Sequence, residues 1–321
     1  MESSKPTMLT ETASPLLAAA DMAREPGAAG RPPLPWGEWG RTALFVGPLL
    51  VVILAFLIIP ACAVLVGAFR LDPVAGAPGG FTLEHVRALA QPQYVSGLKN
   101  SVLLSGGSAL LGTLIGGLLA YAVLGEGGPQ WLRSPLIAFS GVAANFAGVP
   151  LALAFVATLG TTGMVTRLLN GLGLHLYQHG FSLFTFSGLI VVYTYFQIPL
   201  MVVLITPALD GLRREWREAA ENLGASAGQF WRHIGLPILA PSLIASLVLL
   251  FGNAFAAYAT AYALTSGSLP LLPLQIGAVL SGNVISDPHL GQALALLVIV
   301  VMALTMTVYT VLERRGSRWR K

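Results

Sequence analysis

Six long apolar runs limit what this chain can fold into. Each is about as long as a helix needs to cross the roughly 30 Å hydrocarbon core of a bilayer, and each is nearly free of ionisable side chains. Because lipid offers no partner for backbone N–H and C=O groups, these runs must be helices. The sequence therefore predicts an all-α integral membrane protein with six transmembrane helices, at residues 43–69, 101–124, 135–159, 186–209, 237–258 and 293–312.

The composition supports a membrane protein and excludes other classes. Only 10% of the 321 residues are charged and 55% are hydrophobic, which leaves too little polar surface for a soluble fold. The single cysteine, Cys62, lies inside an apolar run, so no disulfide framework is expected. We expect no nucleic-acid partner, because the basic residues border the spans. His175 and His179 have the spacing of metal ligands, but no third ligand is near, so no metal site is expected.

The positive charges predict the orientation. With six spans both termini lie on one side, and that side, with its two connections, holds 14 of the 18 Lys and Arg residues. By the positive-inside rule this side is cytoplasmic. We predict a flexible cytoplasmic tail at residues 1–42, a transmembrane domain at 43–313 with a cytoplasmic loop at 210–236, and a basic cytoplasmic tail at 314–321. The chain is expected to cross its membrane several times.

The cytoplasmic loop at 210–236 predicts two short helices. Apolar residues up to Leu223 recur at helical intervals, and Gly224 follows where a left-handed cap belongs. Ser226 and Gln229 have the spacing of a capping box, which starts a second helix that we expect to end before Pro237. Arg214 with Glu218, and Arg217 with Glu221, are spaced for ion pairs. An alternative reading is an ordinary loop whose helices rest on the lipid interface.

The stretch "EAAENLGASAGQFWRHIGLP" resembles the signature of the membrane subunits of binding-protein-dependent ABC importers, type I. That signature is Glu-Ala-Ala, three residues, Gly, nine residues, then Ile-x-Leu-Pro. The matching residues are Glu218, Ala219, Ala220, Gly224, Ile234, Leu236 and Pro237. The resemblance implies that the first helix couples to a separate ATPase: Glu218 pairs with a basic residue of that subunit, the two alanines make close contact, and Gly224 permits the turn.

The resemblance also implies partners. These are two copies of a cytoplasmic ABC ATPase, a second permease (identical or homologous), and a periplasmic or lipid-anchored substrate-binding protein. The three lysines of this chain do not follow a glycine, so it has no phosphate-binding loop of the Gly-Lys type. We therefore expect no catalytic residue and no cofactor in this chain, and ATP bound by the partner ATPase.

Polar side chains inside spans are candidates for the translocation path, since they are costly in lipid. They are Asn145, Tyr193, Gln197, Asn253 and Tyr258. The alternative is that the amides join helices by hydrogen bonds and that Tyr258 belongs to an interfacial aromatic belt. No acidic residue lies in the middle of a span, which argues against a proton- or sodium-driven transporter.

A second stretch of the chain predicts the cargo. The stretch "GNAFAAYATAYALT" and the loop after it are similar to the polyamine (spermidine/putrescine) branch of the importer permeases. Related permeases carry a sugar, iron, thiamine, a phosphonate or an amino acid, and these stay open as alternatives. A membrane-embedded enzyme is a further alternative, but it would need an ionisable cluster that the spans lack.

Overall fold

The computed structural model describes residues 46–71, 79–125, 127–178, 180–281 and 287–317. The predicted tail at 1–42, His179 and the last residues, 318–321, lie outside this part of the chain. The chain divides into two units, Met1–Pro60 and Ala61–Lys321. Apart from a small antiparallel ribbon of β1 (Arg70–Leu71) and β2 (Gly80–Phe81), the regular structure in the described ranges is helical.

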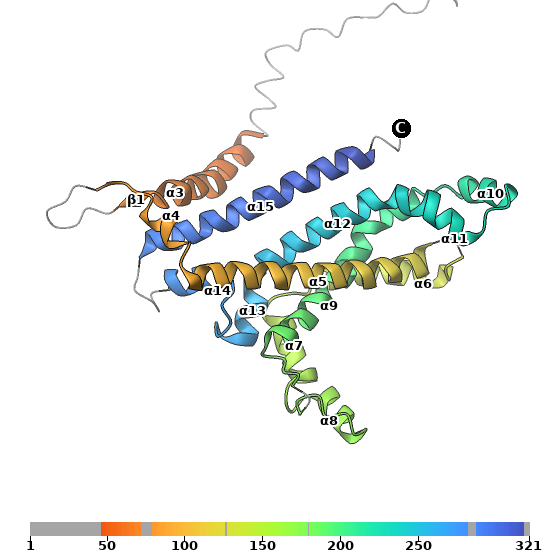
Figure 1. The fold of residues 1–321 in the computed structure, drawn as a ribbon, viewed down its shortest axis with the longest axis horizontal. Coiled ribbons are helices and arrows are strands. Elements are labelled where there is room, and N and C mark those ends of the chain that lie inside the picture. Colours follow the sequence, from red (N-terminus) through yellow and green to blue (C-terminus); the bar gives the residue numbers. More distant parts are fainter. Residues whose placement is uncertain (1–45, 72–78, 126, 179, 282–286, 318–321) are drawn as a thin grey trace, which may run out of the picture. The chain divides into compact units, whose positions relative to one another are not determined.

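The helices of the second unit follow in chain order (Figure 1). They are α4 (Glu84–Ala88), α5 (Pro92–Leu124), α6 (Gln130–Ala143), α7 (Val149–Leu159), α8 (Met164–Gly171), α9 (Phe186–Asp210), α10 (Arg214–Asn222), α11 (Ala227–Phe230), the π-helix η2 (Trp231–Gly235), α12 (Leu236–Ala256), α13 (Tyr258–Thr265), α14 (Leu272–Leu280) and α15 (Pro288–Ser317). The π-helix η1 (Leu54–Ile58) lies in the first unit and leads into α3 (Ile59–Gly67).

The predicted number of membrane spans is confirmed. Six helical stretches of the described chain are long and apolar enough to cross a bilayer. They are Val46–Gly67, Pro92–Leu124, Val149–Gly171, Phe186–Asp210, Ala227–Ala256 and Pro288–Arg314. Five of them contain most of a predicted span, and the third differs.

The predicted third span, 135–159, is wrong as a single helix. The chain forms α6 and α7 instead, with a break at residues 144–148. Gly148 has φ +77° and ψ −149°, a backbone conformation that is open only to glycine. Pro150 follows in the first turn of α7, where a missing N–H costs nothing. Hydropathy alone does not detect this break, because the residues on both sides of it are apolar.

The second short helix that we predicted in the loop does not end before Pro237. α11, η2 and α12 follow one another without a gap, so helix runs from Ala227 to Ala256. Pro237 has no N–H to donate to the carbonyl four residues earlier, and the wider π turn just before it accommodates the ring. In the same way, η1 precedes Pro60 in the first span.

The centre of the second unit is the crossing of α5 with α9, beside α12 (Figure 1). Gly112 and Gly116 of α5 permit it, as the small-xxx-small spacing predicts. A Cβ atom on Gly112 would lie 2.4 Å from the Cβ of Gln197, and one on Gly116 would lie 2.6 Å from the backbone oxygen of Ile198. The two backbones therefore approach closely along this face.

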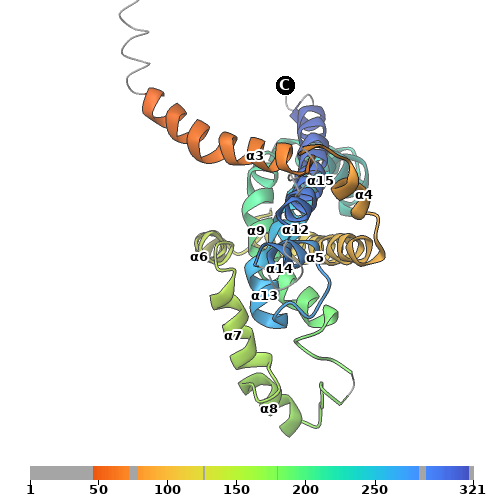
Figure 2. The ribbon, with the colours of Figure 1, turned by 90° about the vertical axis from the view of Figure 1, so that its left-hand side faces the viewer.

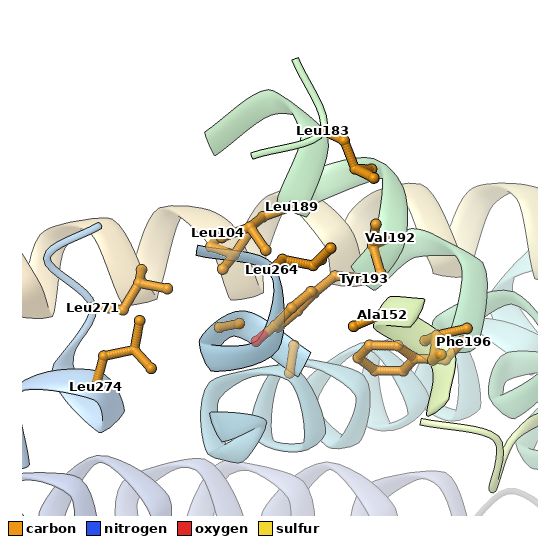
Figure 3. Packing of buried hydrophobic residues seen from close by; sticks show 13 residues of the cluster. Leu104, Ala152, Leu183, Leu189, Val192, Tyr193, Phe196, Leu264, Leu271 and Leu274 are labelled. Carbon is orange, nitrogen blue, oxygen red and sulfur yellow. The ribbon is translucent and has the colours of Figure 1, made fainter. Parts of the chain in front are cut away.

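One apolar cluster surrounds Tyr193 of α9. Leu104, Leu189 and Leu264 pack near its ring, and its hydroxyl points toward the junction of α12 and α13 (Figure 3). The Tyr193 side chain is only 1% exposed. α9 is thus packed against both α12 and α13 at this level.

Candidate functional site

The first four signature residues, from Glu218 to Gly224, lie on α10 and the turn that follows it, as predicted. Gly224 has φ +81°. The Ala225 N–H donates to the Ala220 carbonyl (2.9 Å), and the Gly224 N–H donates to the Glu221 carbonyl (2.9 Å). These two bonds form a Schellman cap, which satisfies the last carbonyls of α10 and requires the left-handed glycine. The predicted left-handed cap is confirmed.

The capping box that starts α11 is also confirmed. The Ser226 N–H donates to the Gln229 Oε1 (2.7 Å), and the Gln229 N–H donates to the Ser226 Oγ (3.3 Å). Because α10 ends in one such motif and α11 begins in another, only Leu223–Ser226 separate the two helices. We call residues 214–237 the coupling segment, after the role that the sequence predicts for them.

The outward face of α10 is charged and internally paired. Arg214 Nε donates to Glu218 Oε1, and Arg217 Nε donates to Glu221 Oε1, both at 2.9 Å. Glu218 is 57% exposed, so a partner can reach its carboxylate. Ala219 is exposed, whereas Ala220 is buried within the chain. Ala219 is therefore the alanine of the pair that offers its side chain to a partner.

The coupling segment borders a groove of about 860 Å³. The other wall is the end of α5 and the start of α6, from Tyr121 to Arg133. Arg133 Nη2 lies 2.6 Å from Asp210 Oδ1, an ion pair that joins α6 to the end of α9. This exposed pair contributes little stability by itself. It holds the start of α6 beside the end of α9, next to the groove.

The remaining signature residues lie on the continuous helix that leaves the loop. Ile234 is half-buried in η2, while Leu236 (51% exposed) and Pro237 are exposed at the start of α12. Sequence reasoning missed Gly235 between them. A Cβ atom there would lie 2.5 Å from the Trp231 ring, so only glycine leaves room for that ring. The tryptophan four residues earlier was the available signal, since these positions are neighbours on a helix.

The predicted path residues fall into two groups. Tyr193 and Gln197 are buried inside the unit. Gln197 Nε2 donates to the Leu250 carbonyl (2.7 Å), and Asn253 Nδ2 donates to Gln197 Oε1 (3.4 Å). These bonds join α9 to α12 and match the alternative that we left open for the amides. Asn253 also has an exposed side chain.

Asn145 and Tyr258 are exposed and lie beside helix breaks. Asn145 Nδ2 donates to the Gly141 carbonyl (2.9 Å), at the end of α6. Tyr258 starts α13 and stacks on Tyr262, with ring centroids 5.4 Å apart. The role of all five residues in a path stays a prediction.

One helix break separates α6 from α7, and a second, at Ala257, separates α12 from α13. The two breaks lie together, with α7 beside α13 (Figure 2). The Gly148 N–H donates to the Thr260 Oγ1 (2.9 Å), across the gap between α7 and α13. The Tyr193 hydroxyl donates to the carbonyl of Ala257, the residue between α12 and α13. Two hydroxyl groups thus satisfy the backbone groups that the breaks expose, as a nonpolar environment requires.

We predict that Thr260→Val destabilises this arrangement. Valine has the same shape as threonine but cannot accept from the part-buried Gly148 N–H, which then loses this partner. We expect a loss of about 1–3 kcal/mol in the free energy of unfolding, seen as a lower melting temperature of the detergent-solubilised chain. Thr307→Val is the control, because that exposed hydroxyl donates only within its own helix, to the Ala303 carbonyl. Equal melting temperatures for the two variants would contradict the role of Thr260.

The fold and the site define a class: a six-span membrane subunit with an exposed, capped helix in one connection. A family model described as "Binding-protein-dependent transport system inner membrane component" matches residues 112–318. The chain belongs to this family. It is therefore a multi-pass permease component of a transport system and is not itself an enzyme.

Curated relatives agree with this family. The chain is 27% identical over 223 residues to the molybdenum transport system permease protein ModB of Mycobacterium tuberculosis, which covers 68% of this chain and 79% of that protein. It is 26% identical over 236 residues to the spermidine/putrescine transport system permease protein PotB of Haemophilus influenzae. That match covers 71% of this chain and 78% of that protein. Two relatives with different named cargoes are thus about equally similar.

Solved structures support the fold. A chain in the crystal structure of a bacterial ABC transporter for the import of the acidic polysaccharide alginate aligns with a TM-score of 0.64 and 20% identity. The alignment covers 89% of this chain and 99% of that chain. The membrane fold of importer permeases is therefore shared at low sequence identity.

Proposed function

We propose that this chain is one permease subunit of an ABC importer in a bacterial inner membrane. It forms half of the translocation path and couples to a separate ATPase through the coupling segment. One observation carries the proposal: Glu218, Ala219 and Ala220 of the signature lie on an exposed, nine-residue helix, and Gly224 forms the Schellman cap that ends it. A helix that is capped at its C-terminal end, presents a charged face and is followed by continuous helix into the membrane is suited to transmit force.

The remaining partners follow from the same proposal. Six spans enclose half a path, so a second permease, identical or homologous, completes it. Two copies of the ATPase bind and hydrolyse ATP, and a periplasmic or lipid-anchored binding protein delivers the cargo. The Arg-rich side of the chain, including the coupling segment, faces the cytoplasm.

Co-purification tests the coupling. The tagged full-length chain, extracted from its native membranes in mild detergent, should bring with it magnesium-dependent ATP hydrolysis. Glu218→Gln should reduce the hydrolysis recovered by about tenfold, because a charge-assisted bond to the ATPase is lost. Glu221→Gln is the matched control: its carboxylate forms the equivalent ion pair and is 54% exposed, against 57% for Glu218.

Two outcomes would contradict the proposal. If the native chain recovers no ATP hydrolysis, the importer assignment is wrong. If Glu218→Gln and Glu221→Gln recover equal amounts, Glu218 does not hold the ATPase.

For the cargo we propose a polyamine. The supporting observations are the stretch Gly252–Thr265 and the relative named for spermidine and putrescine. The relative named for molybdenum favours an oxyanion as the second candidate. The polar side chains Asn145, Asn253 and Tyr258 are uncharged, so the binding protein would choose between a cation and an anion.

Uptake by cells that lack or express the chain separates the two cargoes. We expect ATP-dependent uptake of labelled putrescine, inhibited by excess spermidine and unaffected by molybdate. Uptake of labelled molybdate without uptake of putrescine would replace the polyamine with an oxyanion.

A further inference from the structure

An aromatic side chain of the coupling segment, Trp231, the first residue of η2, contacts the membrane helix α5. Its ring lies edge-on to the Tyr121 ring of α5, with centroids 4.7 Å apart and planes at 81°. The Phe230 ring also lies edge-on to the Trp231 ring, with centroids 5.8 Å apart, and Phe230 is itself buried. Edge-to-face aromatic pairs in this range are favourable beyond the area that they bury.

Gly235 shows how closely the tryptophan is held. Because a Cβ atom at that position would lie 2.5 Å from the ring, the indole lies directly against the backbone one turn further along. The ring is thus bounded by Tyr121, Phe230 and the Gly235 backbone. The residue as a whole is half-buried and lines the groove.

The π turn provides a place to bend. Residues Trp231–Gly235 form a single wide turn between α11 and α12, ahead of Pro237. Such a turn is a common site of helix bending and is often found at functional positions. Movement of α10 therefore has two routes into the membrane: along the helix into α12, and through the Trp231 ring into the end of α5.

We propose that Trp231 is a positioning residue for transport: its contact with Tyr121 makes the coupling segment and the end of α5 move as one body. The inference rests on the proposed function, since it assumes that an ATPase moves α10. It adds that α5 is driven directly. Without the contact, the π turn would bend and α12 alone would follow the ATPase.

The test measures the distance between the coupling segment and α5. Cys62 is the only cysteine, so Cys62→Ala gives a background for two spin labels. One label goes to Leu118→Cys on the exposed side of α5, and one to Gly228→Cys on α11, where a Cβ meets nothing within 4 Å. The labelled chain is measured in its native complex with the ATPase, with ADP and with a non-hydrolysable ATP analogue.

We expect one narrow distance distribution that is the same with both nucleotides. Trp231→Leu should populate a second, nucleotide-dependent distance about tenfold more than the native chain does, the factor that follows from losing one aromatic contact. Tyr121→Leu removes the same contact from α5 and should give the same result, even if Trp231→Leu fails to fold. Tyr121→Phe keeps the ring and should behave as the native chain.

Phe181→Leu is the control for losing an edge-on aromatic pair elsewhere. The rings of Phe181 and Tyr177, in the connection between α8 and α9, have centroids 6.0 Å apart and planes at 76°. It should leave the distance distribution unchanged. The inference is overturned if the native chain shows a nucleotide-dependent distance, or if Trp231→Leu and Tyr121→Leu both leave a single narrow one. If no ATPase co-purifies with the unlabelled native chain, the proposed function fails first and the inference fails with it.

Discussion

Gly116→Val should prevent the chain from folding stably. The new Cβ would lie 2.6 Å from the Ile198 backbone oxygen and 2.8 Å from the Met201 Cβ. A backbone oxygen cannot rotate away as a side chain can, so α5 and α9 must separate along their closest contact. Overpacking of this kind costs about 3 kcal/mol or more, a large share of the 5–15 kcal/mol by which native proteins are stable.

Size-exclusion chromatography and melting of the detergent-solubilised chain measure this effect. We expect most of the Gly116→Val protein in the aggregated fraction, and a lower melting temperature for the rest. Gly117→Val is the matched control, since its Cβ would be 3.7 Å from the Met201 Cε and 3.9 Å from the Leu243 Cδ2, which are ordinary contacts. If Gly117→Val is as unstable as Gly116→Val, the loss of glycine itself is responsible and the close approach of α9 is not.

Gly224→Val should uncouple the chain from its ATPase while leaving the membrane fold intact. The native residue has φ +81°, which strains a β-branched residue by about 2 kcal/mol. The Schellman cap is then replaced by another turn, and α10 no longer has the orientation that a partner binds. If the native turn falls to a minor population, the recovered ATP hydrolysis should fall by about 30-fold.

Gly228→Val separates this backbone effect from side-chain size. Neither Gly224 nor Gly228 has an atom within 4 Å of a new Cβ, but Gly228 lies in α11 at an ordinary helical angle. We expect Gly228→Val to recover nearly native ATP hydrolysis, and both variants to melt like the native chain. Equal loss in the two would refute the role of the left-handed turn.

The elements predicted well from the sequence depend on neighbours along the chain. A span needs about 20 apolar residues. The cap at Gly224 and the capping box at Ser226 need residues within four positions of each other. The family signature likewise lies within 20 consecutive residues, from Glu218 to Pro237. All of these were therefore readable before any helix was placed in space.

The helix boundaries were predicted less well, for a physical reason. In both regions a proline lies two residues after a glycine: Pro150 follows Gly148, and Pro237 follows Gly235. In one case the chain adopts a glycine-only conformation, and in the other it widens to a π turn. Hydropathy cannot distinguish these outcomes, because the residues are apolar in either case.

The sequence by itself determined the class of this protein: six spans, two short helices joined at Gly224, and the permease family. The tertiary structure alone decided that Tyr193 and Gln197 are buried, that the two helix breaks meet at Thr260, and that Trp231 rests on Tyr121. The reason is that helices in lipid are apolar all round. Hydrophobic periodicity therefore marks no inward face, and only the packing of distant helices shows which side chains meet.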